Sequence, residues 1–280
     1  MKEKDFSDDE IEVLGNKNKK SKTKHFICFS ITVFVLFMAL LAVFLLRQNR
    51  SPEINENYVH IEIENIEQDV KQGLIQIAHD TINDVPLLVF IPRNAVPELS
   101  LTFPAETDSS VIFVTQAADV GGNNYGIVGD FVLAGEQLAR GVSKKGFCAI
   151  INNTLTIGVG AETALLEKTK QEKGYFFRQY PLVENGEAID NKPKGKSIRR
   201  ALAICENEVM MIESVNRESF HDFAQALADM GISDAIYLVG STRISGWYRA
   251  NDNQVHLLGN DPIKEDETMH GVNYLVWRVR

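Results

Sequence analysis

The chain has 280 residues, of which 44% are hydrophobic and 24% are charged, with a formal net charge of −9. This composition is ordinary for a folded protein and excludes a chain that is disordered throughout. Residues 1–25 hold seven Lys and six Asp or Glu of the chain's 29 basic and 38 acidic residues, so the remainder carries a net charge of −10. An acidic domain of this kind is a poor partner for nucleic acid, which needs basic surface to displace counterions.

An uncharged apolar segment comes first in chain order. Residues 26–46 contain no charged side chain. As a helix they span roughly 30 Å, the thickness of the hydrocarbon core of a bilayer. A buried core helix would show caps and a polar face, and a cleaved signal peptide would have a shorter apolar stretch and a small-residue cleavage site. We therefore predict a transmembrane helix over 26–46 that anchors the protein in a membrane.

The charges that flank this segment predict its orientation. Five lysines lie close before it, within residues 17–24, whereas Arg47 and Arg50 follow it. Because basic residues tend to stay on the cytoplasmic side, we expect a cytoplasmic N-terminus and an extracytoplasmic main domain. We assign the protein to the periplasmic side of a bacterial inner membrane.

A polar linker at 47–57 leads to the predicted extracytoplasmic domain, residues 58–280. Short runs rich in Val, Ile, Tyr and Phe, bounded by Gly, Pro, Asn or Asp, predict strands. These runs are 58–65, 73–79, 86–91, 99–103, 111–118, 146–151, 154–159, 175–183, 200–204, 208–214, 235–239 and 273–279. Asn153 and Thr154 suit a tight hairpin turn between two of them.

Two segments favour helices. Residues 162–173 place Leu165 and Leu166 among good helix formers. Residues 219–231 have apolar side chains at helical spacing, Ser219 as an N-cap and Gly231 as a terminator. We therefore predict an α+β fold: a mixed, largely antiparallel sheet domain with a few packed helices, preceded by one transmembrane helix.

The cysteines and histidines suggest no metal site. Cys148 and Cys205 lie in apolar runs, which favours buried thiols, although a disulfide between them remains an alternative outside the cytoplasm. The six histidines have no metal-ligand spacing, and no dinucleotide or phosphate-loop signature occurs. We expect no metal and no cofactor.

The first candidate site follows the strand at 111–118. Asp119 precedes the turn Gly121, Gly122, Asn123 and Asn124. A strand end can hold a carboxylate rigidly, and glycines let the backbone approach a ligand. A plain hairpin turn is the alternative.

The second candidate is a pair of arginines, Arg199 and Arg200, at the start of an apolar strand. Strand alternation places one on each face, where a guanidinium can bind a phosphate or carboxylate. A solvated sheet edge is the alternative.

The third candidate follows the strand at 235–239. Small hydroxylated residues, an arginine and two aromatics come directly after this strand. The aromatic rings suit stacking on a sugar, although core packing is the more frequent role of such pairs. The residues concerned are Gly240, Ser241, Thr242, Arg243, Trp247 and Tyr248.

Several segments, in this order, resemble the phosphodiester glycosidase family over residues 80–280. VTQAADVGGNN (114–124) stands where the family has a strand ending in an Asn-Gly-Gly-Phe or Asn-Ala-Asp-Phe turn, and Arg199 matches the arginine of the family's Arg-Thr-Ala-x-Gly strand. The other similar segments are GDFVLAGEQL (129–138), KKGFCAIINNTLTIG (144–158), YPLVENGEA (180–188) and SFHDFAQALADMGISDAIYLVG (219–240).

The resemblance implies a glycosidase-like hydrolase that acts on, or binds, a sugar-1-phosphate diester of the cell envelope. It implies Asp119 as the carboxylate at the scissile bond and Arg199, or Arg200, on the phosphate. The sequence departs from the family at Val239, where typical members have Asp. Glycosidases use two carboxyl groups, so Asp234 or Asp252 would have to replace the missing one. A catalytically degenerate glycan- or protein-binding module is the alternative that Val239 favours.

Overall fold

A computed structural model describes residues 38–39, 59–62, 73–121, 126–261 and 272–279. The chain divides into two compact units, Met1–Ser51 and Pro52–Arg280. The predicted tail, most of the predicted transmembrane helix and the linker lie outside the described residues. Among the residues that are described, no helix is both long enough and apolar enough to cross a membrane.

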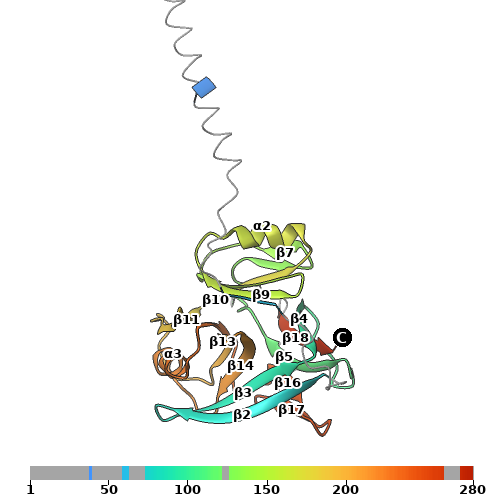
Figure 1. Ribbon diagram of the computed structural model, residues 1–280, viewed down its shortest axis with the longest axis vertical. Coiled ribbons are helices and arrows are strands. Elements are labelled where there is room, and N and C mark those ends of the chain that lie inside the picture. Colours follow the sequence, from blue (N-terminus) through green and yellow to red (C-terminus); the bar gives the residue numbers. More distant parts are fainter. Residues whose placement is uncertain (1–37, 40–58, 63–72, 122–125, 262–271, 280) are drawn as a thin grey trace, which may run out of the picture. The chain divides into compact units, whose positions relative to one another are not determined.

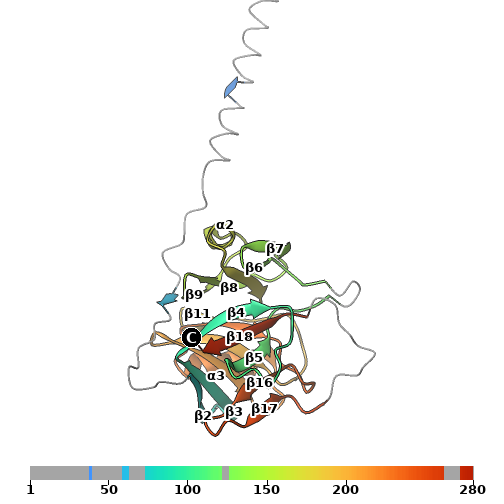
Figure 2. The same ribbon diagram turned by 90° about the vertical axis from the view of Figure 1, so that its right-hand side faces the viewer.

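Three antiparallel sheets form the second unit (Figure 1). The six-stranded sheet has the order β1 (Val59–Glu62), β9 (Thr154–Val159), β8 (Gly146–Ile151), β10 (Tyr175–Gln179), β6 (Phe131–Leu133), β7 (Glu136–Ala139). The seven-stranded sheet has the order β12 (Glu187–Ala188), β11 (Pro181–Glu184), β15 (Asp234–Leu238), β13 (Arg200–Cys205), β14 (Glu208–Ser214), β3 (Val85–Arg93), β2 (Leu74–Ile82). The five-stranded sheet, which faces the viewer in Figure 2, has the order β17 (Val255–Leu258), β16 (Gly246–Arg249), β5 (Val111–Gln116), β18 (Tyr274–Val279), β4 (Ala95–Ser100).

The sheet-rich α+β prediction is confirmed, with differences in detail. The strand expected at 99–103 lies instead at β4, and the strands β12, β16 and β17 were not predicted. The single strand expected at 175–183 is two strands, β10 and β11, which belong to different sheets and meet at Tyr180. This division has consequences for the site described below.

The hairpin expected between β8 and β9 is present. Its turn lies one residue earlier than expected, at Asn152 and Asn153, with φ angles of 48° and 66°, and Thr154 opens β9. Asparagine tolerates this left-handed conformation better than most residues, which explains the position of the turn.

Both predicted helices are present. Helix α2 (Ala164–Gln171) has Thr163 as N-cap and packs Leu165 against the six-stranded sheet. Helix α3 (Phe220–Asp229) has Ser219 as N-cap, whose side chain accepts a hydrogen bond from the Asp222 N–H. Its buried face covers one face of the seven-stranded sheet and includes Phe220, Phe223 and Leu227.

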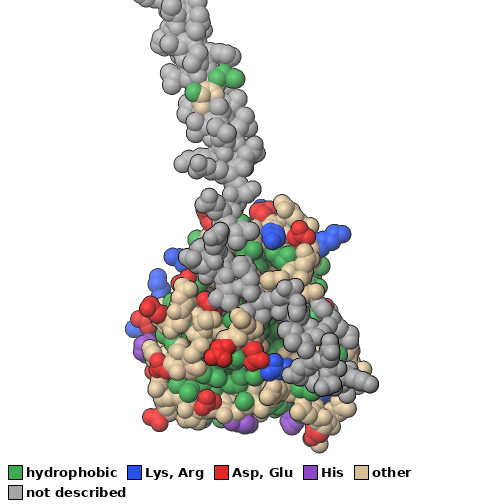
Figure 3. All heavy atoms as spheres, viewed as in Figure 1, with side chains coloured by type: hydrophobic (Ala, Val, Ile, Leu, Met, Phe, Trp, Pro, Cys, Tyr) green, Lys and Arg blue, Asp and Glu red, His purple; other side chains and the backbone are tan. Residues whose placement is uncertain are grey.

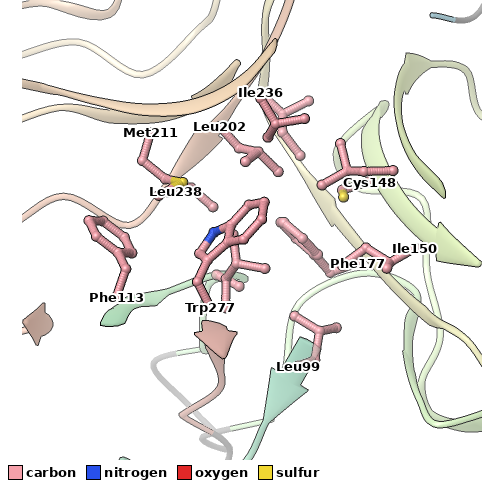
Figure 4. Packing of buried hydrophobic residues seen from close by; sticks show 14 of the residues in the cluster. Leu99, Phe113, Cys148, Ile150, Phe177, Leu202, Met211, Ile236, Leu238 and Trp277 are labelled. Atoms are coloured by element: carbon pink, nitrogen blue, oxygen red, sulfur yellow. The ribbon is translucent and has the colours of Figure 1, made fainter. Parts of the chain in front are cut away.

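The main core lies where the three sheets meet (Figure 4). Trp277 from β18 is surrounded by side chains of all three sheets, among them Phe177, Leu202 and Phe113. Cys148 belongs to this core, and both Cys148 and Cys205 are free thiols, so the disulfide alternative is not realised.

Candidate functional site

Asp119 occupies a fixed position just beyond the end of β5. The buried side chain of Asn273 accepts a hydrogen bond from Ala118 N at 2.8 Å and donates one to Ala118 O at 3.2 Å, as a neighbouring strand would. Asp119 O then accepts a hydrogen bond from Val128 N at 2.8 Å, which closes a hairpin. Gly121 lies in this hairpin, whereas the predicted ligand-binding residues Gly122, Asn123 and Asn124 lie outside the described residues.

Lys144 forms an ion pair with Asp119. The lysine side chain is almost completely covered, with 4% of its surface exposed, whereas the aspartate side chain keeps 34%. The pair therefore joins a buried cation to a carboxylate that solvent, or a ligand, can reach.

Gln179, at the end of β10, holds both members of this pair. Its buried amide donates from Nε2 to Asp119 Oδ1 at 3.1 Å and accepts at Oε1 from Lys144 Nζ at 3.1 Å. Its Oε1 also accepts from Tyr180 N at 3.0 Å, which fixes the direction of the amide. The carboxylate, ammonium and amide are thus positioned before any ligand arrives.

Burial and charge act against each other at this cluster. Burial lowers the pKa of Lys144, and the neighbouring Asp119 carboxylate partly offsets that effect. The Tyr180 ring lies 4.7 Å from Lys144 Nζ, a cation–π arrangement. Burial, and then the charge of Asp119, raise the pKa of the Tyr180 hydroxyl.

Arg199 and Arg200 lie on opposite faces of the seven-stranded sheet, as strand alternation predicts. Arg199 points to the α3 side, where its guanidinium lies 4.0 Å from the Phe220 ring centre. It donates from Nε to Glu218 O at 2.9 Å and from Nη2 to Gly195 O at 2.7 Å. Arg199 is thus occupied in holding neighbouring loops and does not contact Asp119.

Arg200 points to the opposite, internal face and has no exposed surface. It forms an ion pair with Glu213 and donates from Nη1 to Thr115 Oγ1 at 2.6 Å and to Ser245 Oγ at 3.1 Å. Arg200 is therefore completely buried among these protein partners, and its contact with substrate stays a prediction.

The Gly240–Arg243 loop begins close to the Asp119 turn, because Val239 N donates to Gln116 O at 3.2 Å. Gly240 is buried, and a Cβ at this position would lie 2.5 Å from Ile198 O, so the close approach requires glycine. Ser241 and Thr242 are partly exposed and Arg243 is exposed. Ser241 Oγ accepts from Arg243 N at 3.0 Å.

The two aromatics beyond this loop pack inside the protein. Trp247 has no exposed surface and donates from Nε1 to Pro104 O at 3.1 Å. Its stacking on a sugar stays a prediction. Tyr248 is partly exposed but lies between Phe90, at 4.9 Å between ring centres, and His256, at 5.0 Å. Core packing, the alternative considered for this pair, describes Trp247.

Neither carboxylate that was expected to replace the missing family Asp joins Asp119. Asp234 opens β15, at the opposite end of that strand from Gly240, and strand geometry places the two ends roughly 13 Å apart or more. Asp252 is exposed in the turn between β16 and β17, where it caps Gln254 N at 3.0 Å. Among the described residues, no group of three or more His, Cys, Asp or Glu is arranged to hold a metal ion.

Sequence reasoning missed Lys144, Gln179 and Tyr180 as site residues. Lys144 stands beside Lys145 before an apolar strand, a pattern that usually marks a solvated strand start, and Lys145 is indeed exposed. Gln179 lay within a predicted continuous strand. A polar residue followed by Tyr-Pro inside an apolar run was the available signal, because proline is confined to strand ends and edges.

The comparisons with known proteins show a similarity of fold. A scan of family models finds no match, and a search of curated proteins finds none either. Among solved structures, the chain is similar to the catalytic domain of zebrafish N-acetylglucosamine-1-phosphodiester alpha-N-acetylglucosaminidase, auto-inhibited by its pro-peptide. The TM-score is 0.55 at 10% identity, over 80% of this chain and 88% of that one. A hypothetical protein from Synechocystis is similar at a TM-score of 0.47 and 13% identity, over 74% of this chain and 62% of that one.

The zebrafish similarity supports a distant structural relationship and a phosphodiester glycosidase-like fold. Fold alone does not fix activity, which has to be argued from the site.

Proposed function

We propose that this protein is a membrane-anchored phosphodiester glycosidase-like hydrolase that cleaves a sugar-1-phosphate diester of the cell envelope. In this proposal the helix 26–46 anchors the domain on the periplasmic side of a bacterial inner membrane. Asp119 is the carboxylate at the scissile bond. The observation that carries the proposal is the accessible Asp119 carboxylate, held by buried Lys144 and Gln179 within a fold similar to a phosphodiester glycosidase catalytic domain.

The chemistry of the leaving group makes a single carboxylate sufficient. In an ordinary glycoside an alkoxide leaves, so a second carboxyl group must protonate it. A phosphate ester leaves as a stable anion, and its departure depends on electrostatic stabilisation more than on protonation. As the bond between the anomeric carbon and the phosphate oxygen breaks, Asp119 stabilises the positive charge at that carbon or attacks it to form a glycosyl ester. Water then supplies the new hydroxyl group on that carbon, and its proton passes to the released phosphate ester or to solvent.

In this proposal Lys144 has the role at the phosphate that the family resemblance implies for Arg199, or Arg200. Its ammonium is the cation in contact with Asp119, whereas the Arg199 guanidinium is bonded to Glu218 O and Gly195 O. When substrate binds, we expect Lys144 to stabilise the charge of the departing phosphate. Ser241, Thr242 and Arg243, on the adjacent loop, and Tyr248 remain proposed ligand contacts.

Sugar release tests this proposal. Full-length protein in detergent is incubated with a panel of sugar-1-phosphodiesters that includes UDP-N-acetylglucosamine, and free sugar is measured. We expect release by the wild type and its loss in Asp119→Asn and Lys144→Met. The matched controls are Asp252→Asn and Lys145→Met, which change exposed residues of the same types and should retain release. Release that survives in Asp119→Asn would refute the assignment of Asp119.

A second candidate is a catalytically degenerate binding module of the envelope. The observations that favour it are the positions of Asp234 and Asp252, neither of which is bonded to the Asp119 cluster, and Val239 at the family's Asp position. This candidate predicts no sugar release by the wild type, with saturable glycan or sugar-phosphate binding that Lys144→Met weakens. Release by the wild type would exclude it.

A further inference from the structure

Three lysines gather in the loop that connects β12 to β13. Lys192, Lys194 and Lys196 are all exposed. They stand out because the chain beyond residue 25 has a net charge of −10. In Figure 3, basic side chains lie among acidic ones at the left-hand edge of the molecule, beside α3 and β11.

Side-chain hydrogen bonds hold this loop at both ends. At its start, Asn191 Nδ2 donates to Pro181 O at 2.7 Å and to Ile189 O at 3.1 Å. At its end, Arg199 Nη2 donates to Gly195 O at 2.7 Å. Lys192 and Lys194 lie between these two attachments, so the backbone that carries them is positioned.

Both attachments adjoin the aromatic residues that lead to the Asp119–Lys144 pair. Pro181 directly follows Tyr180, whose ring lies 4.7 Å from Lys144 Nζ. The ring centres of Tyr180 and Phe220 are 5.4 Å apart, and the Arg199 guanidinium lies 4.0 Å from the Phe220 ring centre. A continuous series of contacts therefore joins the lysine loop to the candidate site.

The three lysines differ in their partners. Lys196 Nζ lies 3.5 Å from Glu218 and 3.9 Å from Asp222, so its charge is partly balanced. The nearby Asp190 pairs with His221 at 3.0 Å. For Lys192 and Lys194, no ion pair within 4.0 Å is formed with any carboxylate of the described residues. Their ammonium groups are therefore available to an external anion.

We propose that Lys192 and Lys194 bind a second anionic group of the ligand, and that the ligand therefore carries at least two phosphates, as in a chain of sugars joined by 1-phosphodiester bonds. This inference rests on the proposed function, because it extends the same site. Asp119 and Lys144 engage one phosphodiester, and the lysine loop engages a phosphate further along the chain. Arg199 holds this loop against α3 through its bond to Gly195 O and its contact with the Phe220 ring.

Binding to two matched probes tests the inference. The probes are an oligomer of N-acetylglucosamine 1-phosphate diesters and the methyl ester of its single repeating unit, titrated against full-length protein in detergent. The double variant Lys192→Gln/Lys194→Gln is compared with Lys168→Gln/Lys173→Gln, which removes the same charge from exposed positions in and after α2. All changed side chains are exposed, so the variants should fold, which thermal unfolding verifies.

We expect the loop variant to lose about tenfold in affinity for the oligomer at low salt and less at high salt, because exposed charges are screened. Its affinity for the single unit and the affinity of the control variant for both probes should stay at the wild-type values. Equal losses in the loop and control variants, or an equal loss for both probes, would overturn the inference while leaving the proposed function intact. A wild type that neither binds nor cleaves either probe would overturn both.

Discussion

Two cation–carboxylate pairs lie on the two faces of strand β10, and they differ in their exposure to solvent. Arg178 points to one face and pairs with Asp130 at 2.7 Å, with side-chain exposures of 1% and 8%. Gln179, the next residue, points to the other face and holds the Lys144–Asp119 pair, in which the carboxylate keeps 34% exposure. One pair is closed to solvent and the other is open on its acidic side.

The remaining hydrogen bonds of each pair explain the difference in role. Arg178 also donates to Gly160 O at 2.7 Å and Ala161 O at 2.8 Å, and Asp130 accepts from Gly141 N at 3.0 Å. These bonds are all internal, so this pair ties β10 to its neighbouring loops. In the open pair, part of the carboxylate stays exposed to a ligand. We therefore propose that the open pair serves function and that the closed pair serves stability.

Breaking the closed pair should give the largest effect. In Arg178→Met the buried Asp130 carboxylate loses its cation, and we expect the free energy of unfolding to fall by about 3–5 kcal/mol. Urea unfolding measures this loss, with Arg140→Met, at an exposed position, as the control. A loss no larger than that of the control would show that the closed pair is not structural.

Breaking the open pair should lower the free energy of unfolding by a smaller amount, and this loss should depend on pH. In Asp119→Asn, Lys144 stays buried without its carboxylate, and we expect a loss of about 1–2 kcal/mol at neutral pH. Burial lowers the pKa of Lys144 in the folded state, so the folded state binds fewer protons than the unfolded state. Stability of the variant should therefore rise towards the ordinary lysine pKa of about 10.4.

Urea unfolding at neutral pH and near pH 9.5, below that ordinary lysine pKa, measures this dependence. The deficit of Asp119→Asn relative to the wild type should shrink at the higher pH. A deficit that is unchanged or larger there would mean that Lys144 is solvated, and the contrast between the two pairs would fail.

Replacing a buried carboxyl group that has no cation beside it should give the smallest change in the free energy of unfolding. This change should be a gain in stability. Asp234 Oδ2 is buried and has no hydrogen-bond partner among the described residues, and burial raises the pKa of this carboxyl. The folded state therefore binds more protons than the unfolded state, and stability falls as pH rises through the folded pKa. We expect Asp234→Asn to gain up to about 1 kcal/mol at neutral pH.

The same measurement at about pH 3, below the unfolded Asp pKa, should show no gain, because the carboxyl is then protonated in both states. Asp252→Asn, at an exposed turn, is the control and should change stability at neither pH. A loss of stability in Asp234→Asn at neutral pH would show that the charged form is stabilised where it lies.

Local sequence signals predicted the elements whose stabilising interactions are themselves local. Ser219 caps α3 and Gly231, at φ 93°, follows its end, as their positions predict. The alternation of Arg199 and Arg200 across the sheet follows from strand geometry alone. Asp119 was recognised as a candidate because a carboxylate at a strand end is a local pattern.

The partners of these residues depended on packing between distant segments. The sequence suggested that Trp247 and Tyr248 face a ligand. In the structure β16 lies between β17 and β5, and the indole of Trp247 is buried. The sequence suggested that Arg200 binds an anion. In the structure its guanidinium donates to Glu213 and Thr115, which come from other strands. Periodicity gives the face on which a side chain lies and says nothing of what covers that face.

The sequence by itself determined a sheet-rich domain, the ends of α3 and a carboxylate at the end of β5, because propensities, caps and strand alternation act over a few residues. Only the tertiary structure decided that the run 175–183 divides at Tyr180 between two sheets. That division brings Gln179 beside Asp119, 60 residues earlier in the chain, and Lys144, 35 residues earlier. Contacts at such separations arise when the three sheets close around Trp277, since burying their apolar faces together fixes which strand ends meet.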